Sequence, residues 1–390
     1  MNDNQNSYYQ NKKSINQNYW KLSTKTELET HFELFFSQRF NFPSALVPIL
    51  IENHVSKDNF ELFLDPKIKN FLPDPSIFID MDKTVKRIAN EIETKNPIGI
   101  FGDYDVDGAT SAALLKLFLQ YFGIEVHIHI PDRFLEGYGP NISALNSLVS
   151  KGSNLIITVD CGINSHEPLK ELNKTDIDCI IIDHHTPDDD LPPAFSIVNP
   201  KRKENGIEYH YLSAVGVTFI MIVGLTRELR QRGIFKKIKE PNLFRFLDLV
   251  ALGTVCDVVP LKGLNRCFVK AGLNIISQRK NLGINALCDI SDLNKIPDED
   301  TLGYKLGPKI NAAGRIGSSD IGVSLLISKD ISKANELASK LYQLNEKRKK
   351  LTNNSTLEAI GMVESEKNMI GKLPDFLFLV GENWNEGIIG

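Results

Sequence analysis

Cysteine is scarce in this chain of 390 residues, and its five cysteines are scattered. None of them forms a Cys-x-x-Cys pair, so a structural zinc site, which needs clustered ligands at short spacings, is not expected. Scattered unpaired thiols suit a reducing compartment, because disulfides form and persist in oxidising ones. We therefore expect a protein of the cytoplasm.

Long apolar runs are also missing, and none reaches the ~18–20 residues that a membrane span requires. We expect no membrane partner. Residues 1–18 are rich in Asn, Gln and Ser and lack an apolar core, so they predict a disordered tail rather than a secretory signal. A net positive charge is absent as well: the formal net charge is −4. This argues against a protein that coats nucleic acid by bulk charge, but a local basic groove stays open.

What the chain does have is four short clusters of acids and histidines, each closing an apolar run. They read Gly-Asp-Tyr-Asp-Val-Asp-Gly at 102–108, Val-Asp-Cys-Gly at 159–162, Ile-Asp-His-His at 182–185 and Val-Cys-Asp at 255–257. Carboxylate oxygens and neutral imidazoles are the ligands that a pair of divalent metals needs. Four such clusters in one chain indicate a dinuclear site that hydrolyses phosphate esters.

Short apolar runs alternate with helically spaced segments between residues 97 and 198, which predicts βαβ units and a parallel sheet. Ligands of such sheets gather at the carboxyl ends of the strands. Asp103, Asp160 and Asp183 follow three of these runs, so we expect them to meet at one edge. The runs with strand character are 97–103, 124–130, 155–160, 179–183 and 195–198, and 110–121 has helical spacing.

Beyond residue 212 the pattern turns helical, and residues 305–317, with three glycines, read as a loop. Residues 333–351 have the spacing of an amphipathic helix; their basic run at 347–350 is most simply a solvated face, with nucleic-acid contact as the alternative. Residues 374–380 predict a new strand. We therefore expect an α/β protein: a tail (1–18), a helical segment (19–95), a parallel-sheet phosphoesterase domain with helical additions (96–325), a long connecting helix (326–370) and the start of a second α/β catalytic-core domain, cut off by the chain end (371–390).

The acids of the first cluster alternate, so in an extended chain Asp103, Asp105 and Asp107 would face one side. An EF-hand begins with the same pattern, but its twelfth position, a bidentate Glu, is Leu114 here. The nucleophile loop of haloacid-dehalogenase phosphatases is a second alternative, but it does not explain the acid–histidine cluster at 182–185. A plain surface loop is a third, but the mutual repulsion of three adjacent carboxylates is unfavourable there without cations.

The remaining candidate residues each have a simpler, structural interpretation beside the functional interpretation. Asp160 alone would most simply be a turn or helix-cap residue. His184 and His185 could be a core pair; on a strand they would point to opposite faces, so one would be a ligand and the other a phosphate contact, with Asp183 orienting a ring. Asp257 closes a very apolar stretch, where an unpaired carboxylate is costly to bury.

Arg133 and Arg315 lie in segments that contain glycines. Their guanidinium groups suit bidentate recognition of a phosphate. The simpler alternative is a surface arginine in a weak salt bridge.

Together these motifs resemble the DHH phosphoesterase superfamily, and within it the RecJ single-stranded-DNA exonucleases, from about Trp20 to the end of the chain. The segment Asn-Ala-Ala-Gly-Arg at 311–315 favours the exonucleases over the inorganic pyrophosphatases of the superfamily, and the Trp-Asn-Glu-Gly-Ile-Ile-Gly ending at residue 390 also matches. A complete family member continues through a second core domain and an OB-fold, which puts tight strand binding by this chain in doubt.

The resemblance implies two Mn²⁺ ions, with Mg²⁺ as the alternative. Asp103, Asp105 and Asp160 would hold one ion, and Asp107, Asp160, His184 and Asp257 the other. His185 would contact the scissile phosphate beside Asp183, and Arg133, Asn311 and Arg315 would contact the DNA, the two arginines at its 5′-terminal phosphate.

The function implied is 5′→3′ hydrolysis of single-stranded DNA to 5′-mononucleotides in DNA repair and recombination. The expected partner is a DNA strand with a 5′ end, with a helicase or a single-strand-binding protein as further candidates, and we expect a monomer. Two alternatives stay open: a small-substrate phosphodiesterase of the same superfamily acting on short oligonucleotides or cyclic dinucleotides, and a non-catalytic DNA-binding scaffold related to these exonucleases.

Overall fold

The computed structural model describes residues 13–14, 17–19 and 26–390, except 294, 374, 383 and 390. Most of the predicted tail at 1–18 therefore lies outside the described residues. By its internal contacts the chain divides into two units, which meet between Pro66 and Lys67. This division falls inside the helical segment predicted for 19–95; the other domain bounds stay predictions.

The first unit is a small helical body with an aromatic core. Phe36 and Phe60 are fully buried, and their ring centroids lie 4.5 Å apart. Thr26 and Glu29 form a capping box at the start of the first helix, which satisfies two backbone donors that the helix leaves free. The described elements are α2 (Glu27–Phe40), η1 (Ser44–Leu46), α3 (Val47–Glu52) and α4 (Phe60–Leu64).

The second unit is built on a five-stranded parallel sheet with the strand order β2-β1-β3-β4-β5. The chain leaves β1 in one direction to form β2 and then returns to the other side of β1 to form β3. Ligands of such sheets bind at this change of direction, outside the carboxyl ends of β1 and β3. The strands are β1 (Ile98–Gly102), β2 (Val126–His129), β3 (Leu155–Val159), β4 (Asp178–Ile182) and β5 (Ser196–Val198).

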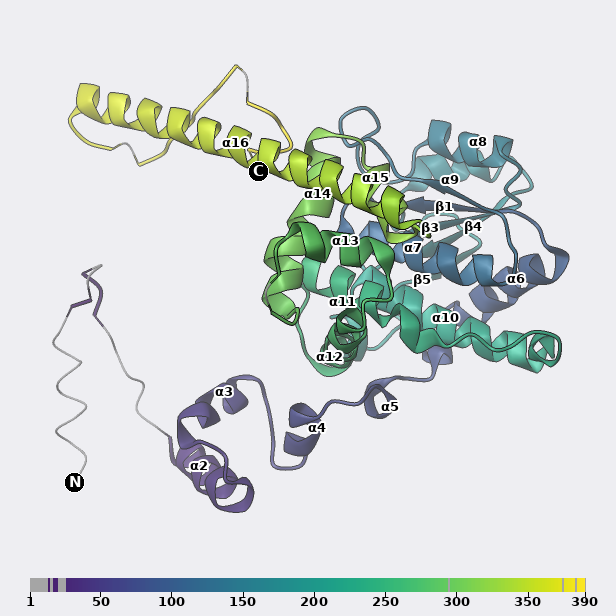
Figure 1. Ribbon diagram of the computed structural model, residues 1–390, viewed down its shortest axis with the longest axis horizontal. Helices are drawn as coiled ribbons and strands as arrows, with labels where there is room; N and C mark the ends of the chain where they lie inside the picture. The colour runs from purple at the N-terminus through teal and green to yellow at the C-terminus, as the bar shows by residue number, and fades with distance from the viewer. Residues whose placement is uncertain are drawn as a thin grey trace. The chain divides into compact units, whose positions relative to one another are not determined.

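Helices cover both faces of the sheet, as the runs of buried Ile, Leu and Val require. In β3, Ile157 faces the larger core with α6, α7, α10 and α11, whereas its neighbour Ile156 faces the smaller core with α8 and α9. In Figure 1, α8 and α9 lie above the strands, and α6 and α10 lie below them. These helices are α6 (Met81–Thr94), α7 (Val106–Tyr121), α8 (Ile142–Ser150), α9 (His166–Leu172), α10 (Ala214–Gln231) and α11 (Leu247–Cys256).

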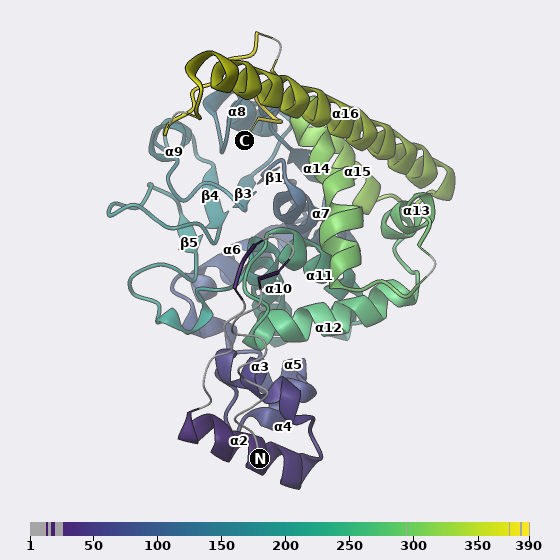
Figure 2. The ribbon, with the colours of Figure 1, turned by 90° about the vertical axis from the view of Figure 1, so that its left-hand side faces the viewer.

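The remaining helices extend this body, and the longest of them, α16, packs along α13, α14 and α15 before it continues past them (Figures 1 and 2). It begins at Ile331, later than the predicted 326, because the Asp330 side chain accepts the Lys333 N–H as its N-cap. These elements are α5 (Ile68–Phe71), η2 (Pro75–Ile77), η3 (Ile207–Tyr209), η4 (Ile234–Lys236), η5 (Leu243–Phe246), α12 (Gly263–Ser277), α13 (Leu282–Ile290), η6 (Thr301–Leu306, a π-helix), α14 (Gly307–Ile316), α15 (Asp320–Leu326) and α16 (Ile331–Ile370).

Two local predictions are wrong. Residues 305–317 are helical (η6 and α14) rather than a loop. Their glycines allow close packing: a Cβ on Gly307 would lie 2.4 Å from Cys256 Sγ, and one on Gly314 would lie 3.0 Å from Tyr104 O. The described residues of 374–380 form no strand, and Phe376 and Phe378 are exposed. A strand needs a neighbour for its backbone hydrogen bonds, and this segment pairs with none of the described strands.

Close helix packing yields a first testable prediction. A Cβ on Gly272 of α12 would lie 2.2 Å from Leu247 O and 2.4 Å from the Ala251 Cβ of α11. Gly272→Ala should therefore lower the free energy of unfolding by about 2 kcal/mol, because overpacking outweighs the gain in helix propensity. Gly361→Ala in α16, where a Cβ meets nothing within 4 Å, is the control and should raise it by about 0.5–1 kcal/mol. Urea unfolding measures both; a Gly272→Ala protein as stable as the parent would contradict the packing argument.

Candidate metal centre

Three acids follow the ends of adjacent strands and continue the ladder of the sheet. Gly102 pairs with Val159, and Val159 pairs with Ile182. One residue further on, the Asp103 N–H donates to Val159 O at 3.3 Å and the Asp160 N–H to Ile182 O at 3.0 Å; the Asp183 N–H donates to Val198 O at 3.1 Å. Backbone pairing thus brings these side chains to one edge, as the sequence predicts.

Asp160 occupies the central position and has a φ of +62°. Residues other than glycine rarely adopt this left-handed conformation, and it persists where the surrounding structure fixes it, often at functional sites. The side chain is 1% exposed, and its Oδ1 has no hydrogen-bond partner among the described residues. The fold therefore holds a buried carboxylate oxygen in a strained position, which only a cation or a donor would compensate.

Asp105 and Asp107 reach the same edge from the first turn of α7. The chain is not extended here, so the predicted alternation along one strand is wrong: Asp105 is the helix N-cap and accepts the Gly108 N–H at 3.0 Å. Gly108 is required because a Cβ there would lie 2.4 Å from Asp103 O. The Asp107 oxygens accept the backbone N–H groups of Ala214 at 2.6 Å and Val215 at 2.9 Å, at the N-terminus of α10.

The His184 ring is oriented to offer a lone pair to the carboxylates. Its Nδ1 lies 3.1 Å from Leu212 O, so Nδ1 carries the proton and Nε2 is free to accept. Nε2 lies 3.3 Å from Asp160 Oδ1, 3.5 Å from Asp257 Oδ2 and 4.0 Å from Asp107 Oδ2. Burial first and the neighbouring His185 next lower the pKa of His184 to about 4, which keeps the ring neutral as a metal ligand must be.

Asp257 joins the group from the C-terminal end of α11. This is the negative end of the helix dipole, where a carboxylate is unfavourable unless a cation is near. The next residue, Val258, has a φ of +59°, a second strained position beside the site. Asp257 Oδ2 is buried without a hydrogen-bond partner among the described residues, like Asp103 Oδ1 and His184 Nε2.

These side chains form three overlapping groups in which the potential ligand atoms lie within 4.8 Å of one another: Asp103–Asp105–Asp160, Asp107–His184–Asp257 and Asp160–His184–His185. Oxygen and imidazole donors at these separations suit divalent cations such as Mn²⁺ and Mg²⁺. Asp160 and His184 each belong to two groups. The residues present therefore fit a pair of divalent ions, and the assignment of individual ligands stays a prediction.

The acids repel one another when no cation is present. Burial, then Asp105, raises the pKa of Asp103 to about 8 and that of Asp257 to about 7. Burial and neighbouring carboxylates also raise the pKa values of Asp107 and Asp160 well above the ordinary range. Holding all of these groups ionised at neutral pH requires compensating positive charge.

Asp183 has a different role from the other acids. Its oxygens accept the backbone N–H groups of Ile163, His184 and His185, and its Oδ1 lies 2.7 Å from His185 Nδ1. Burial opposes its ionisation, but the His185 ring and these donors outweigh burial and lower the pKa of Asp183. The hydrogen bond that the His185 ring donates to Asp183 in turn raises the pKa of His185. Asp183 therefore orients His185.

The sequence did not single out the hydroxyl of Tyr138. It lies 3.2 Å from His185 Nδ1 and 3.3 Å from Asp160 O, so it ties the loop after β2 to the site. The pattern Gly-Tyr-Gly at 137–139, with both glycines at a φ of +80°, was the available signal.

Arginines flank the acids on one side. The Arg133 guanidinium lies 5.3 Å from the centroid of the Tyr104 ring, and Arg315 Nη1 donates to Gly387 O at 2.8 Å. Burial, then Arg133 and Arg348, lowers the pKa of Arg315, so these three cations lie near one another. None of them forms an ion pair with a carboxylate of the described residues. Arg348 belongs to the basic run at 347–350, for which the simplest prediction is a solvated face. The packing of α16 on α14 places it beside Arg315.

Asn311 lies on the face of α14 that is turned toward the acids. Gly307, Asn311 and Gly314 share this face by helical spacing, and the two glycines touch Cys256 and Tyr104. Asn311 Oδ1 is buried without a hydrogen-bond partner among the described residues. The structure therefore places all eleven candidate residues at or around one edge of the sheet.

Known proteins resemble this chain in sequence and in fold. Residues 97–254 match the model of the DHH family, N-terminal domain. The chain is 38% identical, over 84% of its length, to the single-stranded-DNA-specific exonuclease RecJ of Haemophilus influenzae, and 35% identical over 90% to that of Escherichia coli. The chain therefore resembles RecJ exonucleases over most of its own length. It spans 57% and 62% of the lengths of these two relatives.

Solved RecJ structures share the fold. A RecJ exonuclease bound to manganese superposes with a TM-score of 0.69 at 28% identity, covering 80% of this chain and 75% of that one. The Thermus thermophilus RecJ in complex with Mn²⁺ superposes with a TM-score of 0.76 at 25% identity, and the match covers 95% of this chain and 50% of that one. The resemblance to RecJ and the predicted α/β fold with a parallel sheet are thus confirmed. Among the described residues, no helix has both the length and the apolar character needed to cross a bilayer.

The raised pKa values predict how stability depends on pH. Unfolded aspartates titrate near pH ~4, whereas folded Asp257 and Asp103 titrate near 7 and 8, so the folded state holds protons more tightly. Their stabilising contribution is full below pH ~4 and is lost as the pH rises toward about 8. In chelator, the urea midpoint should therefore fall between about pH 5 and about pH 8, and saturating Mn²⁺ at the higher pH should restore it by binding the ionised form.

Asp257→Asn is the matched variant for this prediction. Removal of the charge should flatten the pH dependence in chelator and weaken the stabilisation by Mn²⁺. A midpoint that responds neither to pH nor to Mn²⁺ would contradict the proposed origin of the repulsion.

Proposed function

We propose that the protein is a divalent-metal-dependent exonuclease that degrades single-stranded DNA in the 5′→3′ direction and releases 5′-mononucleotides. The observation that carries this proposal is the buried Asp160 carboxylate, which lies within ligand distance of two separate groups of acids and imidazoles. The names of the relatives, single-stranded-DNA-specific exonucleases, support the substrate. Because the chain spans under two thirds of them, activity, substrate and partners are all part of the proposal.

Two divalent ions fit the donor set. Asp103, Asp105 and Asp160 would hold one, and Asp107, His184 and Asp257, together with Asp160, the other. Bound there, they supply positive charge for the phosphate oxygens and lower the pKa of water. Manganese suits the mixed carboxylate and imidazole donors better than magnesium, which prefers oxygen ligands and several waters. RecJ structures have been solved with manganese and also with magnesium, so the choice of manganese rests on the donor set.

His185 would contact the scissile phosphate. Its Nδ1 is engaged by Asp183, so the remaining ring N–H at Nε2 is available to a phosphate oxygen. Asp183 also raises the pKa of His185, which favours the charged ring that an anion attracts. Water would attack the first internucleotide phosphorus in line, and the positioned ring would stabilise the negative charge that develops on the oxygens.

Arg133 and Arg315, with Arg348 behind them, would bind the 5′-terminal phosphate. Guanidinium groups bind phosphate with paired hydrogen bonds, and this cluster has no carboxylate counter-charge among the described residues. A terminal phosphate fixed beside the acids would place the first internucleotide bond at the metals and thereby set the polarity. Tyr104 and Tyr138, whose ring centroids lie 6.4 Å apart, offer faces for base stacking next to this cluster.

The central test is the Asp160→Asn variant, assayed with end-labelled single-stranded DNA and Mn²⁺. Loss of the shared carboxylate should lower kcat by at least about 10³-fold, the scale of removing one strong electrostatic contribution. The protein should stay folded, because a repulsive buried charge is removed. Asp292→Asn, at an exposed position, is the matched control. Retention of most of the activity would overturn the role of Asp160.

The same digestion distinguishes the alternatives. Release of labelled mononucleotide from the 5′ end of a long strand supports the proposal, whereas hydrolysis of dinucleotides alone would indicate a small-substrate phosphodiesterase. Absence of both manganese binding and hydrolysis in the parent protein would indicate a non-catalytic scaffold.

The direction of hydrolysis and the recognition of the 5′-terminal phosphate are tested by changing Arg133. Arg133→Gln should raise KM about tenfold for a 5′-phosphorylated strand and much less for a 5′-hydroxyl strand, since one charge-assisted hydrogen bond is worth ~1.5–3 kcal/mol. Lys340→Gln removes a similar charge from an exposed position on α16, outside the basic run at 347–350, and serves as the control. Equal effects on both substrates would place Arg133 outside the terminal-phosphate site.

A further inference from the structure

Three consecutive cations follow the last strand of the sheet, and two of them are paired with acids. The Arg202 guanidinium donates to Asp80 Oδ2 at 2.9 Å. Lys203 Nζ lies 2.7 Å from Asp189 Oδ1. Of the three, only Lys201 forms no ion pair with a carboxylate of the described residues, although its side chain is partly buried. The Lys201 ammonium is therefore free to bind an anion from outside the chain.

The backbone of Lys201 is tied to the histidine pair by Asn199. This buried side chain donates from Nδ2 to His185 O at 2.9 Å and accepts the Lys201 N–H at its Oδ1, at 2.7 Å. Asn205 Nδ2 donates to Asn199 O at 2.7 Å and holds the turn from its other side. The Asp183 N–H donates to the last carbonyl of β5, which directly precedes Asn199. The turn that carries Lys201 therefore lies at the same edge of the sheet as the acids.

The charge of Lys201 acts on two side chains of the metal centre. Burial, then Asp105, raises the pKa of Asp257 to about 7, and Lys201 is one of the charges that oppose this rise. Burial, then His185, lowers the pKa of His184 to about 4, and Lys201 contributes to the lowering. Because the effect of a charge falls with distance, the Lys201 ammonium lies near both side chains.

Cations therefore flank the metal centre in two places. Arg133 lies over the ring of Tyr104, in the cluster at 102–108, whereas Lys201 lies by His184 and Asp257. Divalent ions bound at the acids would take up the carboxylate oxygens near Lys201. Its three N–H donors would then be left for an oxygen of the substrate.

An exposed apolar side chain lies next to Asp257. Val258 directly follows this acid, is 86% exposed and has a φ of +59°. Residues with a branched Cβ avoid this conformation, and such strain gathers at active sites and at contacts with ligands. Val258 packs against little of the protein, so its side chain offers an apolar surface to a base or a sugar beside the metals.

We propose that Lys201 binds the phosphate that follows the scissile phosphate on its 3′ side, and that the nucleotide between these two phosphates lies against Val258. This inference rests on the proposed function, which puts the 5′-terminal phosphate at the arginines and the scissile phosphate at the metals. The next phosphate of the strand then reaches past the metals to Lys201, whose ammonium suits a phosphate oxygen as a point charge. Strands of three or more nucleotides would therefore bind better than dinucleotides.

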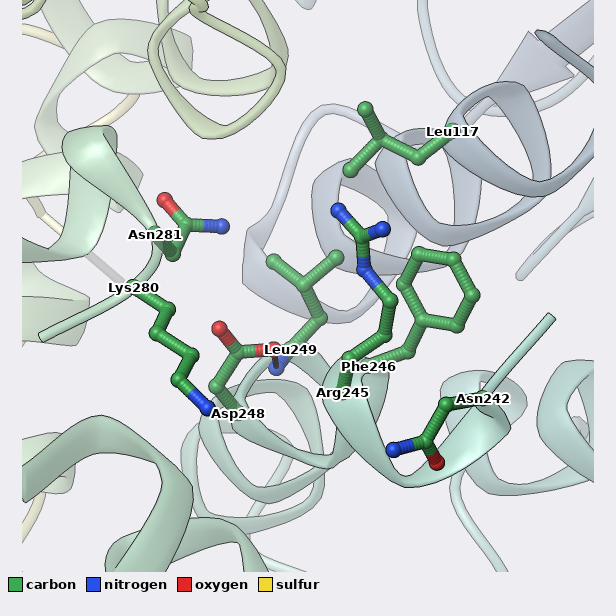
Figure 3. A pocket seen from close by; sticks show the side chains of 8 residues that line it. All are labelled: Leu117, Asn242, Arg245, Phe246, Asp248, Leu249, Lys280 and Asn281. Atoms are coloured by element: carbon green, nitrogen blue, oxygen red, sulfur yellow. Dashed lines mark hydrogen bonds between the residues drawn. The ribbon is translucent and has the colours of Figure 1, made fainter. Parts of the chain in front are cut away.

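A lysine at the opposite end of α11 provides a control. Asp248 lies in the first turn of this helix, ~13 Å along its axis from Asp257. It lines a cavity of about 260 Å³ together with Lys280, and Figure 3 shows the Lys280 ammonium beside the Asp248 carboxylate. Lys280→Gln thus removes a lysine that lies by an acid of the same helix but away from the metals. Lys203→Gln is a second control, because it removes an exposed, ion-paired lysine two residues from Lys201.

The test is the Lys201→Gln variant, assayed on the full chain at saturating Mn²⁺ with 5′-phosphorylated thymidine dinucleotide and trinucleotide. The trinucleotide carries the phosphate assigned to Lys201, and the dinucleotide does not. Lys201→Gln should raise KM about tenfold for the trinucleotide and less than about twofold for the dinucleotide, with little change in kcat. Lys201→Arg, which keeps the charge, should retain most of the affinity for the trinucleotide. Both control variants should behave like the parent, and thermal unfolding checks that every variant is folded.

The contact with Val258 is tested separately. Val258→Asn removes the apolar surface and introduces a residue that tolerates a positive φ, so the variant should stay folded. It should raise KM for the dinucleotide and the trinucleotide alike, since both contain the nucleotide assigned to Val258. An unchanged KM for both would remove Val258 from the proposal.

Binding without turnover provides an independent measurement. In the Asp160→Asn background with Mn²⁺, fluorescence anisotropy follows the binding of a labelled, 5′-phosphorylated single strand at several salt concentrations. Lys201→Gln should reduce the slope of log K against log salt concentration by about 0.7, the contribution of one phosphate contact on a single strand. Lys203→Gln and Lys280→Gln should leave the slope unchanged.

Three results would overturn the proposal: a KM for the trinucleotide that Lys201→Gln leaves unchanged, an equal rise for both substrates, or an equal effect of Lys203→Gln. An equal rise for both substrates would place Lys201 at the scissile phosphate instead. A parent protein that hydrolyses neither substrate, but whose strand binding loses one phosphate contact in Lys201→Gln, would sink the proposed function alone. An active nuclease that Lys201→Gln leaves unchanged would sink this inference alone.

Discussion

Mutual repulsion of buried carboxylates is the constraint around which this fold is arranged. Asp103, Asp107, Asp160 and Asp257 approach one another in a region from which water is largely excluded, and each has a pKa raised by burial and by its neighbours. Such a group is stable as a set of anions only with positive charge among them. A parallel sheet brings the acids together, and the helices then fix where each oxygen points.

Three helices contribute their ends to the metal centre: α7 and α10 their N-termini, and α11 its C-terminus. The N-terminus of α7 carries Asp105 and Asp107, and the N-terminus of α10 donates two backbone hydrogen bonds to Asp107. The C-terminus of α11 carries Asp257, and Gly253 on the same helix has no room for a side chain: a Cβ would lie 2.3 Å from Thr110 Oγ1 and 2.9 Å from Asp107 Oδ1. Close packing of α11 on α7 thus fixes the position of Asp257 relative to Asp107.

Positive charge is concentrated beside the acids, although the net charge of the whole chain is −4. Arg133, Arg315 and Arg348 come from a loop, from α14 and from α16, and they gather beside the acids without pairing with them. Anions and cations that lie close but unpaired would suit the proposed substrate, a chain of phosphates. The arginines would bind one phosphate, and metal ions held by the acids would supply positive charge at the next.

The sequence by itself determined the strands, the parallel sheet and the acids at the strand ends. Short apolar runs and the acids that close them are local features, and the hydrogen bonds between parallel strands bring those acids to one edge. The resemblance to RecJ could be recognised for the same reason, because its motifs are short and local. Sequence reasoning failed where glycine served packing: Gly307 and Gly314 read as loop residues, yet they lie in a helix that touches Cys256 and Tyr104. It also treated 103–107 as extended, although Asp is a preferred N-cap residue and Asp105 directly precedes α7. Only the tertiary structure brought Arg348 to Arg315 and the Tyr138 hydroxyl to His185. These contacts join segments far apart in the chain, and the packing of whole helices decides them.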